Sequence, residues 1–180
     1  PQLEQWLRQR YGELVVLHAP LRSYSSFVHC YAKPERLGVD RWLAMLGAAA
    51  SVPAANDRWL VIDAGTALTV DLLERQQQQL LHQGGYIVPG LALAQSALFN
   101  HAERVCDYTD EVPATDFLPG TDTLGCVSAG VRCQQLALLQ HLSDRYPSAE
   151  LVVSGGDGAW LAQAPGCRFT ADMVFDGMED

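Results

Sequence analysis

The chain has 180 residues, of which 48% are hydrophobic and 18% are charged, and this is the composition of a packed globular protein rather than a disordered one. Its formal net charge is −9, with only 12 Lys and Arg residues, which argues against a nucleic-acid partner because phosphates need clustered cations. Five cysteines without a CxxC pair argue against a disulfide framework or a zinc site. No apolar run approaches the roughly 20 residues that span a bilayer. We therefore expect a cytoplasmic protein with no membrane partner.

The first part of the chain is predicted to form a helix, a strand, a loop and a second helix. Apolar residues at helical spacing predict a helix over 2–11, and the apolar run LVVLH predicts a buried strand over 14–18. A loop containing proline and glycine then leads into an alanine-rich helix that Asp40 could cap. The stretch SVPAAND, residues 51–57, follows this helix with a proline and polar residues and predicts a domain boundary.

The second part begins with a predicted three-stranded meander. WLVID (59–63) and ALTVDLL (67–73) flank the turn AGT, and LLHQGGYIVPG (80–90) follows a glutamine-rich connection that we interpret as a solvated turn. The later elements are predicted, in order, as a helix over 90–105, a loop rich in Pro and Asp over 106–122, a helix over 123–146, a strand with a glycine turn over 151–158, a short helix over 159–165 and a final strand within 167–178.

The stretch VIDAGTALTVD, residues 61–71, interrupts an apolar run with a carboxylate, a glycine and a hydroxyl. Gly65 would let the backbone approach a ligand, Thr66 and backbone N–H groups could donate to phosphate oxygens, and Asp63 could hold a cation. The alternative is a plain hairpin in which Asp63 and Thr66 satisfy local backbone groups. Taken by itself, the turn is compatible with both interpretations.

The stretch GVDRW, residues 38–42, places an acid beside an arginine at the start of a helix. Asp40 could accept a proton from a substrate hydroxyl while Arg41 clamps a carboxylate. The alternative is an N-cap aspartate beside a surface arginine. Asp71 is the nearest competing carboxylate, but it has no arginine next to it in the sequence.

The motifs YAKPERLGVDRW, VIDAGTALTVD, GGYIVPG, GTDTLGCVSAG and LVVSGGDG occur in this order and at separations that resemble those of the type III pantothenate kinases. The resemblance runs from about residue 10 to the end. That family belongs to the superfamily of actin, sugar kinases and heat-shock 70 chaperones, which bind ATP between two ribonuclease-H-like domains. Five ordered motifs make the resemblance specific, although each motif alone is weak.

The resemblance implies a role for each matching residue. Asp40 matches the proton acceptor of the reaction, and Asp63 matches the ligand of an activating monovalent cation, K⁺ or NH₄⁺. The residues at pantothenate-contacting positions are Tyr31, Gly38, Val39, Arg41 and Thr123, and those at ATP-contacting positions are Gly65, Thr66, Gly155 and Gly156. Asp122 departs from the Asn that relatives often have before the threonine.

The fold class that the resemblance implies is α/β, a ribonuclease-H-like or actin-like ATPase fold with two similar domains. Residues 1–55 would be the remainder of the first domain and residues 56–180 the second domain. The family opens with a strand carrying Asp-x-Gly-Asn-Ser/Thr, whose turn holds ATP phosphates and whose aspartate helps to place Mg²⁺. This chain contains no such motif, so we expect the N-terminal part of the first domain to be absent from it.

The function implied is ATP-dependent phosphorylation of pantothenate to 4'-phosphopantothenate, the first step of coenzyme A biosynthesis, with Mg²⁺ and a monovalent cation, in a homodimer. One alternative is a non-enzymatic regulator, because Bvg accessory factor, described as a transcriptional activator, belongs to the same family. The other is a different small-molecule kinase or a phosphatase, since a fold does not fix a substrate.

Overall fold

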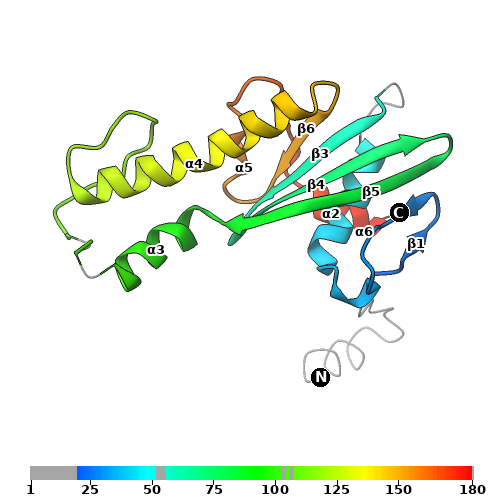
Figure 1. Ribbon diagram of the computed structural model, residues 1–180, viewed down its shortest axis with the longest axis horizontal. Coiled ribbons are helices and arrows are strands. Elements are labelled where there is room, and N and C mark those ends of the chain that lie inside the picture. Colours follow the sequence, from blue (N-terminus) through cyan, green and yellow to red (C-terminus); the bar gives the residue numbers. More distant parts are fainter. Residues whose placement is uncertain (1–19, 52–55, 103, 106–107, 180) are drawn as a thin grey trace.

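The computed structural model describes residues 20–51, 56–102, 104–105 and 108–179, so the helix predicted over 2–11 and the strand predicted over 14–18 lie outside the described residues. Its elements, in chain order, are β1 (Ser23–Tyr24), β2 (Phe27–Val28), a 3-10 turn (Pro34–Arg36), α2 (Val39–Ser51), β3 (Arg58–Ala64), β4 (Ala67–Gln76), β5 (Gln79–Pro89), α3 (Leu91–His101), α4 (Thr123–Arg145), β6 (Glu150–Ser154), α5 (Gly158–Leu161), β7 (Cys167–Phe169) and α6 (Met173–Glu179). The structure is therefore a mixed α/β fold (Figure 1).

The strands form one seven-stranded sheet in the order β1-β2-β5-β4-β3-β6-β7. The predicted meander is confirmed, because β4 runs antiparallel to both β3 and β5. The glutamine-rich connection is a tight turn between β4 and β5, with Gln77 at a φ of 56°. Beyond the meander, β6 runs parallel to β3 and β7 runs parallel to β6.

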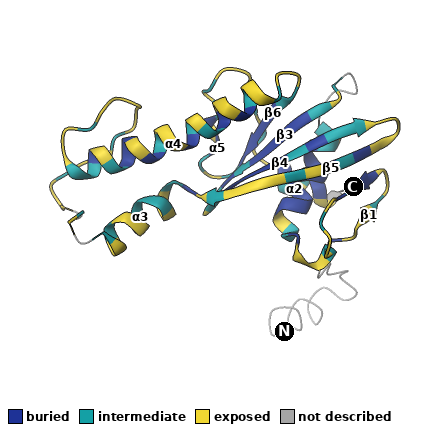
Figure 2. Cartoon of the chain, in the orientation of Figure 1, coloured by how far each residue is buried: buried dark blue, intermediate teal, exposed yellow. Residues whose placement is uncertain are grey.

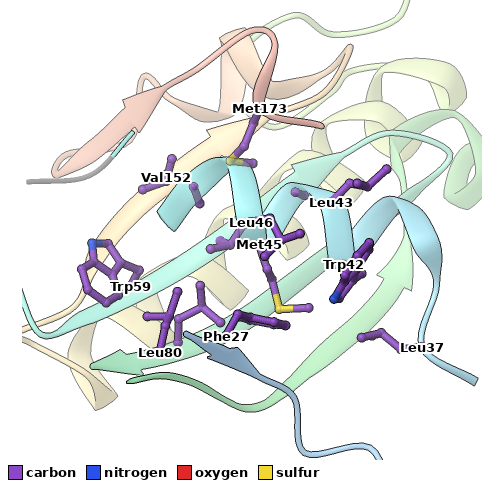
Figure 3. Packing of buried hydrophobic residues seen from close by; sticks show 14 residues of the cluster. Phe27, Leu37, Trp42, Leu43, Met45, Leu46, Trp59, Leu80, Val152 and Met173 are labelled. Atoms are coloured by element: carbon purple, nitrogen blue, oxygen red, sulfur yellow. The ribbon is translucent and has the colours of Figure 1, made fainter. Parts of the chain in front are cut away.

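Helices cover both faces of the sheet. Successive residues of a strand point to opposite sides, so each strand contributes side chains to two hydrophobic clusters. On one face, Trp59 and Val61 of β3 join a cluster with α2 and Met173 of α6 (Figure 3). On the other face, Leu60 and Ile62 pack with side chains of α4 and α5. The result is a three-layer arrangement in which the central strands are buried along most of their length (Figure 2).

The end of the chain differs from the prediction of a single final strand. Only residues 167–169 form a strand, and α6 follows it and packs against α2. The two helix backbones meet at Gly47 and Gly177: a Cβ atom on Gly47 would overlap the carbonyl oxygen of Met173, and one on Gly177 would overlap that of Leu43. The local sequence of α6 is a weak helix signal, and the close packing on α2 is what a single-sequence pattern does not contain.

None of the helices in the described part of the chain is long and apolar enough to cross a membrane.

We expect Gly47→Ala to destabilise the fold by about 1–3 kcal/mol, because the new methyl group would push α6 away from α2. The matched control is Gly130→Ala in α4, where an added Cβ meets nothing within 4 Å. That control should stabilise the protein by about 0.5–1 kcal/mol, since alanine is the better helix former. Thermal unfolding of both variants measures the difference, and equal melting temperatures would contradict the packing role of Gly47.

Candidate active site

A buried polar cluster lies between the first turns of α2 and the sheet, and we call it the Arg41 cluster: Arg41, Asp71, His82 and Tyr31. Arg41 donates from Nε to Asp71 Oδ2 at 2.9 Å and from Nη2 to Asp71 Oδ1 at 2.5 Å. Its Nη1 donates to the hydroxyl of Tyr31 at 2.7 Å. The Nε2 atom of His82 lies 2.8 Å from Asp71 Oδ1. A bidentate pair of this kind fixes the guanidinium in one plane.

Strand register explains why Asp71 meets α2. Asp71 lies opposite Val61 in the antiparallel pair of β3 and β4, so its side chain points to the face that α2 covers. The side chains of Arg41 and Asp71 are only 5% and 2% exposed. Burial works to lower the pKa of Arg41, but the hydrogen bonds and charge of Asp71 outweigh it and raise that pKa above its ordinary value. The pair is therefore charged and mutually compensated.

Asp71, which has no arginine beside it in the sequence, is paired with Arg41 in space. One sequence-based interpretation is wrong at this cluster: the alternative of an N-cap aspartate with a surface arginine fails, because Arg41 is buried and α2 already begins at Val39. Asp40 instead lies in the first turn, is exposed, and accepts a hydrogen bond from the backbone N–H of Arg41 at 2.9 Å.

Asp40 and Asp63 lie close enough, at the edge of the Arg41 cluster, for the charge of one to act on the other. Asp63 is half-buried near the end of β3, on the strand face that α2 covers. Burial and then the negative charge of Asp40 raise the pKa of the Asp63 carboxyl above its ordinary value. A half-buried carboxylate beside a second negative charge is a suitable environment for a cation, which would relieve the repulsion.

Three glycine turns meet at the same end of the sheet as Asp63. Gly155, after β6, has a φ of +93°, and a Cβ there would lie 2.6 Å from Asp63 Oδ1. Gly90, after β5, donates its N–H to the carbonyl oxygen of Thr66 at 2.9 Å, and a Cβ on Gly90 would overlap the carbonyl of Gly65. The predicted ATP-contacting residues Gly65, Thr66, Gly155 and Gly156 therefore belong to turns that touch or adjoin one another.

The predicted pantothenate-contacting residues fall into two groups. Tyr31, Gly38, Val39 and Arg41 lie together near the start of α2, and a Cβ on Gly38 would come 2.5 Å from Asp40 Oδ1, so a side chain there would displace that carboxylate. Thr123 is the first residue of α4, at the end of that helix distant from α2 (Figure 1). Asp122 is the N-cap of α4 and accepts from the N–H of Gly125 at 2.6 Å, which accounts for an acid at that position.

The sequence interpretation missed Asp71 as a partner and missed His82 altogether. The sequence did contain a signal for such a partner: Asp71 is a lone carboxylate within the apolar strand ALTVDLL, and a buried charge requires a partner. Within the described ranges, no group of three or more His, Cys, Asp or Glu side chains could hold a metal ion. Any cation at Asp63 would therefore take further ligands from backbone carbonyls, water or a bound phosphate.

Fold and site together define an α/β protein with carboxylates and glycine turns gathered at one end of the sheet, the place where open α/β sheets commonly bind ligands. Residues 2–145 match the family model of the type III pantothenate kinases. The chain belongs to this family.

Curated relatives agree with the family model. The type III pantothenate kinase of Pseudomonas fluorescens is 34% identical over 183 residues, covering 96% of this chain and 70% of that protein. That of Hahella chejuensis is 35% identical over 158 residues, covering 87% of this chain and 63% of the relative. A crystal structure of a Baf family transcriptional activator from Campylobacter jejuni is similar with a TM-score of 0.55 and 25% identity, covering 81% of this chain and 63% of that one. The chain thus spans about two thirds of the length of these proteins.

Membership in this family gives the chain the function of a kinase that transfers phosphate from ATP to pantothenate in coenzyme A biosynthesis. The curated relatives are named as kinases, so the regulatory alternative is not favoured, although the solved relative carries the activator title.

Proposed function

We propose that Asp40 is the catalytic base of pantothenate phosphorylation and that the Arg41 cluster holds it in place. The observation that carries this proposal is the position of Asp40: it is an exposed carboxylate in the first turn of α2, next to an arginine that is buried and paired with Asp71. A carboxylate within reach of a primary hydroxyl can align that oxygen and take its proton as the bond to phosphorus forms.

Arg41 and Tyr31 form the adjoining wall of the proposed pantothenate site. Three of the five N–H donors of Arg41 are used by Asp71 and Tyr31 among the described residues. Its charge is compensated by Asp71, so Arg41 would attract the carboxylate of pantothenate less than a free arginine would. Its main contribution would then be to orient Tyr31 and the first turn of α2, with any remaining donors directed at the substrate.

Asp63 is proposed to hold the activating monovalent cation. The raised pKa of its carboxyl, caused by burial and by Asp40, supports this role because a cation would relieve an unfavourable negative charge. When bound, such a cation and the Mg²⁺ that accompanies ATP would offset the charge of the phosphates. Gly65, Gly155 and Gly156 would offer the nucleotide backbone groups that carry no side chain of their own, and Thr66 would add its hydroxyl.

The strand order supports the finer fold assignment. We propose that β3 to β7 form the ribonuclease-H-like second domain, because three antiparallel strands are followed by two strands parallel to the first, in the order β5-β4-β3-β6-β7. Residues 1–55 are proposed to be the remainder of a similar first domain. On this proposal β1, β2 and α2 come from that first domain: β2 pairs in parallel with β5 and extends the sheet of the second domain, and α2 packs on its face.

We expect Asp63→Asn to raise the melting temperature at pH 7 while removing cation-dependent turnover. A raised folded-state pKa means that the folded chain binds the proton more tightly than the unfolded chain, so stability falls as pH rises from about the ordinary value of 3.8 through the folded pKa. Asparagine removes the cost of the ionised carboxyl in the folded chain. At low pH the carboxyl of the unaltered protein is protonated, so the two proteins should then melt at similar temperatures. Melting curves across pH and kinase assays in K⁺ and in Na⁺ measure both effects.

Asp144→Asn on the exposed surface of α4 is the control, and it should change neither the pH dependence nor the cation dependence. Cation-independent turnover of the unaltered enzyme would contradict the proposed role of Asp63 and return the AGT turn to the hairpin interpretation.

We also propose that the protein forms a homodimer through α3 and the adjoining part of α4. None of the described residues of α3 is buried, and both segments extend beyond the end of the sheet (Figure 1). The side chains of Leu93 and Leu98 in α3 are 44% and 41% exposed, and that of Ile87 on the preceding strand β5 is 61% exposed. A helix with so much exposed apolar surface is expected to have a partner. A dimer could also bring Thr123 of one subunit to the site of the other.

We expect Leu98→Glu to shift the protein from dimer to monomer, because a buried carboxylate at an apolar contact is strongly unfavourable. Sedimentation at micromolar concentration measures the change. Ser148→Glu, in the exposed segment between α4 and β6, adds the same charge away from α3 and should leave the dimer intact. A monomeric unaltered protein would exclude the dimer proposal.

A further inference from the structure

Cys30 differs from the other described cysteines in what its sulfur contacts. It is exposed, and its Sγ lies 3.8 Å from Nδ1 of His82. By contrast, Cys126 Sγ donates to the carbonyl of Gly120 at 3.2 Å, and Cys133 Sγ to that of Phe117 at 3.9 Å. A carbonyl oxygen accepts the S–H proton and favours the thiol form, whereas an imidazole nitrogen can take the proton away.

The tautomer of His82 is set by its other nitrogen. Nε2 lies 2.8 Å from Asp71 Oδ1, and a carboxylate is an acceptor, so Nε2 carries the proton. In the neutral ring, Nδ1 is then the basic nitrogen, and it is the atom that faces Cys30. The side chain of His82 is fully buried and stacks on Tyr31, with ring centroids 6.0 Å apart, so the imidazole is held in this orientation.

Cys30, His82 and Asp71 thus form a series of nucleophile, base and orienting carboxylate. We propose that Cys30 is a nucleophilic thiol that reacts with low-molecular-weight disulfides, and so is a site of reversible modification outside the phosphoryl-transfer chemistry. Asp71 is already paired with Arg41, so its charge is shared between the arginine and the imidazolium that would form. The proposal does not depend on the kinase roles assigned above.

The exchange step balances without another reactant. His82 Nδ1 takes the thiol proton, and the Cys30 sulfur attacks one sulfur of the disulfide. A new S–S bond forms between Cys30 and that sulfur, while the original S–S bond breaks. The departing thiolate takes the proton from the His82 imidazolium and leaves as a thiol. Because Tyr31 follows Cys30 in the chain, the attached group would lie beside the proposed pantothenate site.

The charged and titratable groups around this thiol come from several elements. They are His82 on β5, Asp71 on β4, Arg41 on α2, and Tyr31, His29 and Arg22 near β1 and β2. Burial, followed by the charges of His82 and Arg22, lowers the pKa of His29, which keeps that ring neutral.

The test is a competition among cysteines within one molecule of the full chain. The protein is exposed at pH 7 to limiting iodoacetamide, or separately to oxidised glutathione, and each cysteine is followed by peptide mass mapping. We expect Cys30 to react at least about tenfold faster than Cys126 and Cys133, and to form a mixed disulfide that dithiothreitol removes. Equal reactivity of the three cysteines would overturn the proposal.

The matched variant is His82→Gln, whose side-chain amide can still donate to Asp71 but has no basic nitrogen for Cys30. At pH 7, Cys30 should react at least about tenfold more slowly in the variant than in the unaltered protein, because the variant has no base to take the thiol proton. An equal rate at Cys30 in the two proteins would overturn the role of His82. If the variant fails to fold, the competition among the cysteines of the unaltered protein decides the question alone.

Discussion

Asp40→Asn is expected to lower kcat for pantothenate by about 10²- to 10⁴-fold, with only a modest change in KM. Asparagine keeps the size of the side chain and one acceptor oxygen but cannot take the proton of the substrate hydroxyl, and general-base catalysis contributes about this factor. The hydrogen bond from the backbone N–H of Arg41 can be kept by the amide oxygen. Steady-state kinetics of the purified variant measure the loss.

Measuring the stability of Asp40→Asn together with its turnover distinguishes a catalytic role of Asp40 from a structural one. If Asp40 served only the start of α2, the substitution would cost about 1 kcal/mol of stability or less and leave turnover almost intact. Removing the charge also relieves the repulsion on Asp63, so the melting temperature should change little. Glu35→Gln, an exposed carboxylate in the preceding 3-10 turn, is the control and should keep full activity. Near-normal turnover of Asp40→Asn would exclude it as the base.

Asp71→Asn is expected to destabilise the fold by about 3–5 kcal/mol, because it leaves the buried guanidinium of Arg41 without a counter-charge. For a chain of this length the melting temperature should fall by roughly 10 °C or more. Asp71 also orients His82, so the loss extends to a second buried side chain. Chemical denaturation and thermal unfolding measure the effect.

The control for Asp71 lies on the same strand. Glu74 pairs with Arg58 at 3.0 Å, and these side chains are 25% and 43% exposed, so Glu74→Gln should cost about 1 kcal/mol or less. Both substitutions remove a carboxylate of β4 that is paired with an arginine. The difference between their effects on stability therefore measures the contribution of burial. Equal losses would mean that the Arg41 cluster stabilises the fold no more than a surface ion pair does.

Much of the fold was readable from the sequence. Apolar runs separated by turns located β3, β4 and β5, the glutamine-rich turn joined two of them, and the long helix predicted over 123–146 is observed at Thr123–Arg145. The site motifs were also readable, because glycine turns and short acidic signatures are local features of a chain. Their order identified the family that the comparisons then established.

The tertiary structure decided how these motifs meet. Arg41 and Asp71 are far apart in sequence, and only the register of β4 and the packing of α2 bring them together. The same is true of Asp40 with Asp63 and of Cys30 with His82. The helix α6 depends on a close contact between Gly47 and Gly177 rather than on its own propensity. A single sequence encodes local periodicity directly, but pairings across the sheet depend on the balance of packing and desolvation over the whole core.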